Sequence, residues 1–262
     1  MKTFRRLGAV AAVLAVTAGL AGCGSDDKKD TPAGSDQVTG TVTVFAAASL
    51  TETFTKLGKD FEAAHQGVKV VYSFGASSAL AEQIKQGAPA DVFASAAPAN
   101  MQQVVDAGDV TGTPATFVSN RLEIAVPKGN PGHITGLADF GKSDPKLALC
   151  AEQVPCGAAA KKVFEAAGIT PQPDTREQDV KAVLTKVTLG EVDGALVYRT
   201  DVKAAGDKVE GIDFPESAKA VNAYPIAPLA KAPNAAAAAA FVDYIKSAQA
   251  KQVFAAAGFE TP

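Results

Sequence analysis

Residues 43–52 read Thr-Val-Phe-Ala-Ala-Ala-Ser-Leu-Thr-Glu, an apolar segment that passes through three alanines into Ser49. The apolar part predicts a buried strand, and Ser49 followed three residues later by Glu52 forms a capping box that predicts a helix start. The first amides of a helix have no partner within the helix, and the positive end of its dipole lies there, so this turn favours an anion. A well-capped helix without a ligand has the same pattern, and both interpretations stay open for this segment alone.

The same order of strand, small residues and helix occurs twice more. Residues 72–80 read Tyr-Ser-Phe-Gly-Ala-Ser-Ser-Ala-Leu, and residues 154–158 read Val-Pro-Cys-Gly-Ala, with proline near the helix start. Neutral N–H and O–H groups can hold a doubly charged ion when they are preorganised. Three such turns therefore predict a site for a small oxyanion.

Strands and helices alternate along the rest of the chain. Apolar runs predict strands at residues 41–46, 68–73, 91–95, 121–127, 146–150 and 194–198. Helical patterns occupy residues 49–65, 78–86, 156–167 and 179–189, and Asn234 and Ser247 are expected to cap two C-terminal helices. This alternation predicts an α/β fold with mostly parallel sheets, in which ligands bind beyond the carboxyl ends of the strands.

The N-terminus has the features of an export signal. Lys2, Arg5 and Arg6 precede an apolar run at residues 7–20 that is short for a transmembrane helix, so we expect residues 1–22 to be a signal peptide. Residues 20–23, Leu-Ala-Gly-Cys, resemble a lipobox, which implies a lipid on Cys23 and anchoring to the cell membrane. An ordinary signal peptide with an incidental cysteine is the alternative. The polar residues 23–40 are expected to be a flexible tether before a folded body that begins near Thr41.

The other two cysteines, Cys150 and Cys156, would lie in an oxidising compartment, where a disulfide is favoured over two free thiols. We expect no metal site at this pair, because no histidine or further cysteine lies nearby in the sequence. The net charge of −3 argues against nucleic acid, which requires clustered basic residues.

The sequence gives little support for catalysis. His65 and His133 are the only two histidines in the chain, and nucleophile-elbow, Walker and zinc-protease motifs do not occur. Asp91 and Asp201 lie near the anion-binding turns, where a carboxylate would repel an anion, so we interpret both as structural hydrogen-bonding groups. We therefore expect a binding protein and no enzyme.

Several motifs together resemble the periplasmic molybdate-binding proteins of ABC importers. They are AAASLTE at residues 46–52, SFGASSALAEQIKQGAPADVFASA at 73–96, VPCGAAA at 154–160, QDVKAVL at 178–184, GALVYRTDV at 194–202 and VFAAAGF at 253–259. The resemblance implies a two-lobed, type II-like binding-protein fold with two hinge crossings, near residues 121–127 and 221–227, and the ligand in the cleft between the lobes. Lobe 1 would comprise residues 41–125 and 223–262, and lobe 2 residues 126–222.

The resemblance also implies a ligand set. Ser49 and Ser77 would offer hydroxyl and backbone N–H groups, Cys156 and Val180 backbone N–H groups, and Tyr198 its phenol. Many relatives have alanine at the position of Cys156, a change that a backbone donor tolerates. Each residue also has an ordinary structural interpretation, as a helix cap, a first-turn residue or a core ring.

The function implied is that of a monomeric extracytoplasmic lipoprotein. It would bind molybdate, and tungstate comparably, as a ligand and without a cofactor, and deliver it to an ABC permease with its ATPase. Phosphate, which keeps a proton near neutral pH, is disfavoured because no contact in the set is acidic. A lipoprotein that binds sulfate or another oxyanion is one alternative, and an oxyanion sensor with the same fold is the other.

Overall fold

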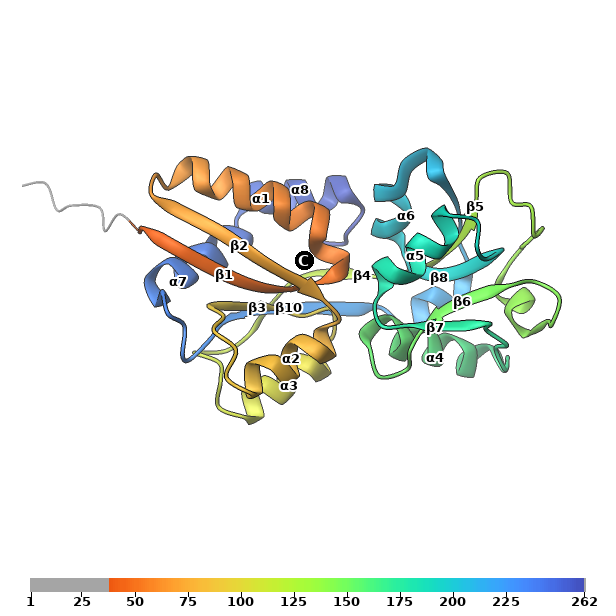
Figure 1. The fold of residues 1–262 in the computed structure, drawn as a ribbon, viewed down its shortest axis with the longest axis horizontal. Helices are drawn as coiled ribbons and strands as arrows, with labels where there is room; N and C mark the ends of the chain where they lie inside the picture. Colours follow the sequence, from red (N-terminus) through yellow and green to blue (C-terminus); the bar gives the residue numbers. More distant parts are fainter. Residues whose placement is uncertain (1–37, 262) are drawn as a thin grey trace, which may run out of the picture. The chain divides into compact units, whose positions relative to one another are not determined.

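The computed structural model describes residues 38–261, which form two α/β lobes, each built on a five-stranded sheet (Figure 1). The expected signal peptide, Cys23 and most of the expected tether lie outside the described residues. Within residues 38–261, none of the helices has the length and apolar character needed to cross a bilayer.

The first lobe surrounds a sheet with strand order β2-β1-β3-β10-β4. Its strands are β1 (Gly40–Ala47), β2 (Val68–Gly75), β3 (Val92–Ala94), β4 (Ala115–Asn120) and β10 (Asn222–Pro228). Its helices are α1 (Thr51–Ala64), α2 (Ser77–Lys85), α3 (Pro98–Asp106), α7 (Ala235–Ile245) and α8 (Ala248–Ala257). Helices α1 and α8 lie on one side of this sheet and α2 and α3 on the other (Figure 1), so both faces of the sheet are buried in apolar clusters.

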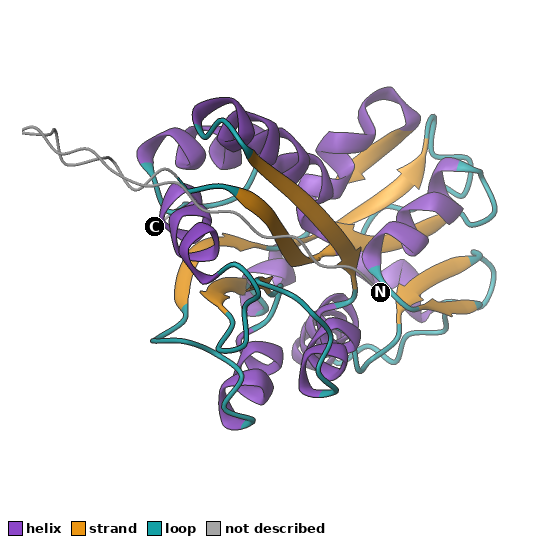
Figure 2. Ribbon diagram, turned by 60° about the vertical axis from the view of Figure 1, so that its left-hand side comes forward, coloured by secondary structure: helices purple, strands orange, loops and turns teal. Residues whose placement is uncertain are grey.

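The second lobe surrounds a sheet with strand order β7-β6-β8-β5-β9. Its strands are β5 (Leu122–Pro127), β6 (Leu147–Cys150), β7 (Thr175–Glu177), β8 (Gly194–Tyr198) and β9 (Val209–Ile212). Its helices are α4 (Pro155–Ala167), α5 (Val180–Thr188) and α6 (Arg199–Ala205). Figure 2 shows the strands of both sheets in orange, with helices in purple packed around them.

The sheets are mixed, whereas the sequence predicted mostly parallel ones. Strand β10 runs antiparallel to β3 and β4, and β5 runs antiparallel to β8 and β9. Each of these two strands enters its sheet directly from the other lobe. It therefore starts at the edge where the neighbouring parallel strands end, and it must run in the opposite direction.

The chain crosses between the lobes at two places. It leaves β4 at Asn120 and begins β5 at Leu122, and it returns to the first sheet at Asn222. All of β5 pairs within the second sheet, so the expected boundary between residues 125 and 126 falls inside a strand of the second lobe. We place the two crossings at Arg121 and Val221.

The helix ends follow local sequence signals. Asn234 Oδ1 accepts a hydrogen bond from the amide of Ala237 (3.3 Å), and Ser247 Oγ accepts one from the amide of Ala250 (3.2 Å), which confirms both expected N-caps. Helix α4 ends at Ala167 and is followed by the cap residue Gly168, whose φ of 67° lies in the left-handed region that glycine adopts readily. The C-terminal alanine-rich stretch is thus divided into two helices at Ser247.

Candidate functional site

A small cavity lies between the lobes, at the carboxyl ends of β1, β2 and β8 and at the starts of three helices. The volume of the cavity is about 20 Å³, somewhat above the roughly 10–15 Å³ that one water molecule needs, so only a small ligand can fit. The first lobe contributes Ala47, Ala48, Ser49, Gly75, Ala76, Ser77 and Ala96, and the second Val154, Pro155, Cys156, Asp179, Val180 and Tyr198. The structure thus brings together all five residues of the predicted ligand set.

Two buried serines form the wall from the first lobe. Ser49 lies in a 3-10 helix, Ala48–Leu50, and its hydroxyl is hydrogen-bonded to the phenol of Tyr224 at 2.9 Å. Ser77 is the first residue of α2, and its Oγ accepts a hydrogen bond from the amide of Ala96 at 2.9 Å. The first α-helical bond of this turn runs from the amide of Leu80 to the carbonyl of Ala76, so the amide of Ser77 precedes it. Hydroxyl and amide donors are therefore available at the same turn.

The wall from the second lobe presents the first turns of two helices. In α4, the first helical bond runs from the amide of Ala158 to the carbonyl of Val154 (2.9 Å), so the amide of Cys156 lies before it. In α5, Asp179 Oδ1 accepts from the amides of residues 181 (2.9 Å) and 182 (3.0 Å). The amide of Val180 is the first-turn donor that this cap does not use. Both helices therefore direct the positive ends of their dipoles to the cavity.

Asp179 is a lining residue that the predicted set lacks. Its carboxylate is an unfavourable neighbour for an anion, but Oδ1 already accepts the two amide hydrogen bonds of the α5 cap. The sequence did contain a signal, since aspartate is a preferred N-cap and stands at the start of the predicted helix 179–189.

Tyr198 closes the cavity from the end of β8 with 1% of its surface exposed. Its Oη accepts a hydrogen bond from Asn222 Nδ2 at 3.0 Å, and its ring meets that of Tyr224 edge to face. Burial, with further contributions from Tyr224 and Asp201, raises the pKa of Tyr198 well above its usual value. The phenol therefore keeps its proton near neutral pH and can donate it.

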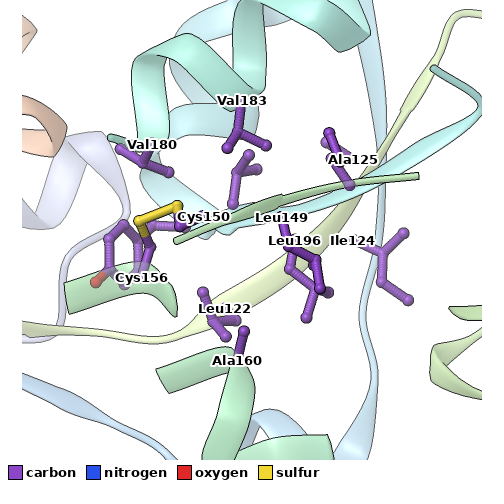
Figure 3. Close-up of a cluster of buried hydrophobic side chains, with 14 of the residues drawn as sticks. Leu122, Ile124, Ala125, Leu149, Cys150, Cys156, Ala160, Val180, Val183 and Leu196 are labelled. Carbon is purple, nitrogen blue, oxygen red and sulfur yellow. A yellow bond between two sulfur atoms is a disulfide. The ribbon is translucent and has the colours of Figure 1, made fainter. Parts of the chain in front are cut away.

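A disulfide joins Cys150, the last residue of β6, to Cys156 in the first turn of α4, with Cα atoms 5.8 Å apart. Figure 3 shows the bond beside Val180 and at the edge of the apolar core of the second lobe. The bridge attaches the turn that carries the Cys156 amide to the end of a buried strand. Among residues 38–261, no cluster of three or more histidine, cysteine, aspartate or glutamate side chains could hold a metal ion.

The predicted capping box at Ser49 and Glu52 does not form. Helix α1 begins at Thr51 without a side-chain cap, because Ser49 is turned toward Tyr224 in the preceding 3-10 helix. The carboxylate of Glu52 instead crosses to the second lobe, where both its oxygens lie 2.8 Å from Lys181 Nζ.

Lys181 also pairs with the fully buried Asp201, at 2.9 Å. Burial by itself would lower the pKa of Lys181, but Asp201 and Glu52 together raise it. Burial raises the pKa of Asp201, and Lys181 opposes that shift. Asp91 accepts hydrogen bonds from the amides of Thr43 (2.7 Å) and Asn234 (2.6 Å). Asp201 Oδ2 accepts one from the amide of Tyr198 (3.2 Å). Both carboxylates thus have structural partners, and neither lines the cavity.

Known proteins resemble the chain over most of its length. The family model described as bacterial extracellular solute-binding protein matches residues 42–260. The molybdate-binding protein ModA of Mycobacterium tuberculosis is 40% identical over 97% of both chains. A putative ABC transporter substrate-binding lipoprotein of Bacillus subtilis, YvgL, is 32% identical over 84% of this chain and 86% of its own. Among solved structures, the periplasmic molybdate-binding protein of Azotobacter vinelandii superposes with a TM-score of 0.75 at 22% identity, covering 84% of this chain and 99% of that one.

Proposed function

Because the chain belongs to the family of bacterial extracellular solute-binding proteins, we propose that it captures molybdate outside the cytoplasm and delivers it to an ABC transporter. The observation that carries this proposal is the convergence of Ser49, Ser77, Cys156, Val180 and Tyr198 on one small cavity between two lobes. The identity of 40% to a relative named as a molybdate-binding protein supports the choice of ion.

The proposed mechanism is capture by neutral donors. The hydroxyls of Ser49, Ser77 and Tyr198 and the amides of Cys156 and Val180 surround the ion, and three helix starts add their dipoles. Binding energy from both walls stabilises the arrangement in which the lobes meet, and the crossings at Arg121 and Val221 act as the hinge. The ion is a ligand, and no cofactor takes part in this mechanism. Tungstate, with the same charge and shape, binds comparably.

The test is calorimetric titration of the chain from residue 24 onward, which contains every described residue, with molybdate, tungstate, sulfate and phosphate at one pH. Replacing Ser49 or Ser77 by alanine removes a hydrogen bond to a charged group, worth about 1.5–3 kcal/mol, so the dissociation constant should rise by about 10- to 150-fold. Ser78→Ala is the matched control, because Ser78 follows Ser77 in α2 without lining the cavity. Tight binding of sulfate with none of molybdate would favour the sulfate-binding alternative.

The anchoring half of the proposal is tested separately. We propose that Cys23 carries a lipid that holds the receptor at the membrane, near the permease and its ATPase. Labelling of cells with a radioactive fatty acid should mark the wild-type protein, and Cys23→Ser should abolish the label and release the protein from the membrane fraction. Label that persists in Cys23→Ser would refute a lipid at this residue without affecting the proposed ligand.

A further inference from the structure

Asn222 contacts both lobes at the second crossing. It is the first residue of β10, and its Nδ2 donates one hydrogen bond to the carbonyl of Ala96 at 2.8 Å and another to Tyr198 Oη at 3.0 Å. A carbonyl oxygen can only accept, so the contact with Ala96 determines which end of the Asn222 amide faces the site. The nitrogen of that amide, and not its oxygen, therefore faces the phenol.

This orientation decides what Tyr198 can do. A phenol oxygen that accepts a hydrogen bond from Asn222 cannot return its own proton to the same group, so the proton points elsewhere. The hydroxyl of Tyr224 is a second acceptor beside the phenol, but a bound anion is the stronger acceptor. Because Tyr198 lines the cavity, its proton is available to an anion bound there. A glutamine or aspartate oxygen in the same place would have the opposite effect and draw the phenol proton away from the ligand.

Ser77 is oriented by the same principle. Its Oγ accepts from the amide of Ala96, a group that can only donate, so the proton of the serine hydroxyl also points elsewhere. Ala96 thus contacts both systems: its N–H holds Ser77, and its carbonyl holds the amide of Asn222. In this way two hydroxyls from different lobes each accept from the protein and keep their own proton for another acceptor.

We propose that Asn222 is a positioning residue that makes Tyr198 a hydrogen-bond donor to the bound oxyanion, and so favours fully deprotonated ions over ions that carry a proton. The inference deepens the proposed function and rests on it. A molybdate ion offers only acceptor oxygens, which match the five donors of the predicted set. The carboxylate of Asp179 also lines the cavity, with its Oδ1 already bound to two amides of α5. Hydrogenphosphate has one O–H group, which needs an acceptor, and the bond from Asn222 already occupies an acceptor position of the Tyr198 phenol, so Tyr198 is a poor partner for that group.

The test combines two substitutions in a double-mutant cycle, with molybdate as the probe. Asn222→Leu should weaken molybdate binding by about tenfold or more, the worth of a hydrogen bond to a charged group. Tyr198→Phe should have a similar effect. If Asn222 acts through the phenol, then Asn222→Leu should change the affinity less than about twofold in the Tyr198→Phe background. Equal losses in both backgrounds would show a general structural role and overturn the inference, as would wild-type affinity in Asn222→Leu.

Asn222→Asp supplies a second readout. The new carboxylate accepts the phenol proton, so the ratio of molybdate to hydrogenphosphate affinity should fall more than in Asn222→Leu. Asn234→Asp is the matched control, because Asn234 Nδ2 also donates to two acceptors. These are the backbone carbonyls of Thr39 and Thr41, at the opposite end of β1 from the cavity. It makes the same chemical change and should leave the affinity ratio unaltered. An equal change of ratio in both variants would refute a specific role for Asn222.

Two further measurements separate the possible failures. Wild-type protein that binds none of the oxyanions refutes the proposed function, and the positioning role fails with it. Wild-type binding with unaltered Asn222 variants refutes the positioning role alone. The ¹³Cζ resonance of Tyr198 reports its hydrogen bond without any ligand and should shift in Asn222→Leu. Asn222→Ser, too short to reach the phenol, replaces Asn222→Leu if thermal unfolding shows that the leucine variant is not folded.

Discussion

The ion pairs around Lys181 offer a quantitative test, because one partner lies across the lobe boundary and the other lies in the core. The side chain of Glu52 is 52% exposed and belongs to the first lobe, whereas that of Asp201 is 0% exposed and belongs to the second. Exposed ion pairs contribute about 0.2–1 kcal/mol, and the contact of both Glu52 oxygens with Lys181 places this pair near the upper value. Glu52→Gln should therefore weaken the closed arrangement and raise the molybdate dissociation constant by about two- to fivefold.

Removal of the lysine should have a different and larger effect. Lys181→Met leaves the buried carboxylate of Asp201 without its cation, and breaking a buried pair in this way costs about 3–5 kcal/mol of folding free energy. This cost should be greatest at high pH. Burial already raises the pKa of Asp201, and loss of Lys181 raises it further above the unfolded value, so the variant loses stability as pH rises through this range. Adding Asp201→Asn to Lys181→Met removes the buried charge and should restore most of the stability.

The assays are urea unfolding followed by circular dichroism, at pH 5 and pH 8, and molybdate titration at low and high salt. Glu82→Gln is the matched control for Glu52→Gln, because Glu82 is 53% exposed in the same lobe but pairs with Lys85 within its own helix. Glu82→Gln should leave the affinity unchanged, and the effect of Glu52→Gln should shrink with salt. If Lys181→Met unfolds at the wild-type urea concentration, or if Glu82→Gln and Glu52→Gln weaken binding equally, the reasoning is wrong.

Three other predictions concern the second lobe. In Gly157→Ala the new methyl group would clash with the backbone carbonyl of Ala151, so both the unfolding free energy (by about 1–3 kcal/mol) and the molybdate affinity should fall. Burial, with a contribution from a nearby aspartate, raises the pKa of Glu123 to about 7. The unfolding free energy of the wild type should therefore fall relative to that of Glu123→Gln as pH rises from about 4.5 to 8. The same pH dependence of the unfolding free energy in both proteins would contradict this. Mild reduction of the Cys150–Cys156 disulfide should lower the molybdate affinity measured by calorimetry. If the affinity and the rate of lobe closure are both unchanged, the disulfide has no role in presenting the Cys156 amide to the ligand.

Local sequence signals were sufficient for much of the fold. The strand predicted at residues 194–198 has the bounds of β8, and the helix predicted at residues 156–167 differs from α4 by one residue. Helix α3 and strands β4 and β10 were not predicted. Polar residues interrupt the apolar ones in α3, β4 ends in polar residues, and β10 contains two prolines. The pairing of β4 with β10 is also long-range. The antiparallel direction of β5 and β10 depends on the lobe crossings, because the residue pattern of a strand does not indicate the direction in which it runs.

The residues of the candidate site were likewise predictable only in part. Strand-to-helix turns with small residues pointed to Ser49, Ser77 and Cys156, while Val180 and Tyr198 came only from the family resemblance. The bonds that orient these donors were not predictable, since they join residues distant in the chain. Asn222 and Tyr224 are two residues apart on one strand, a spacing that puts both side chains on the same face. Which of the two faces points to the cavity depends on how the strand pairs in the sheet.

The disulfide has a consequence for when the receptor becomes competent. A bridge of this kind persists only in oxidising surroundings, so a newly made chain in the reducing cytoplasm would carry two thiols at residues 150 and 156. The turn that offers the Cys156 amide would then be held by packing alone. Oxidation after export adds the covalent link to the end of β6, and the receptor would gain its final affinity in the compartment where its ligand must be scavenged. Maturation of the binding site would in this way be timed by translocation.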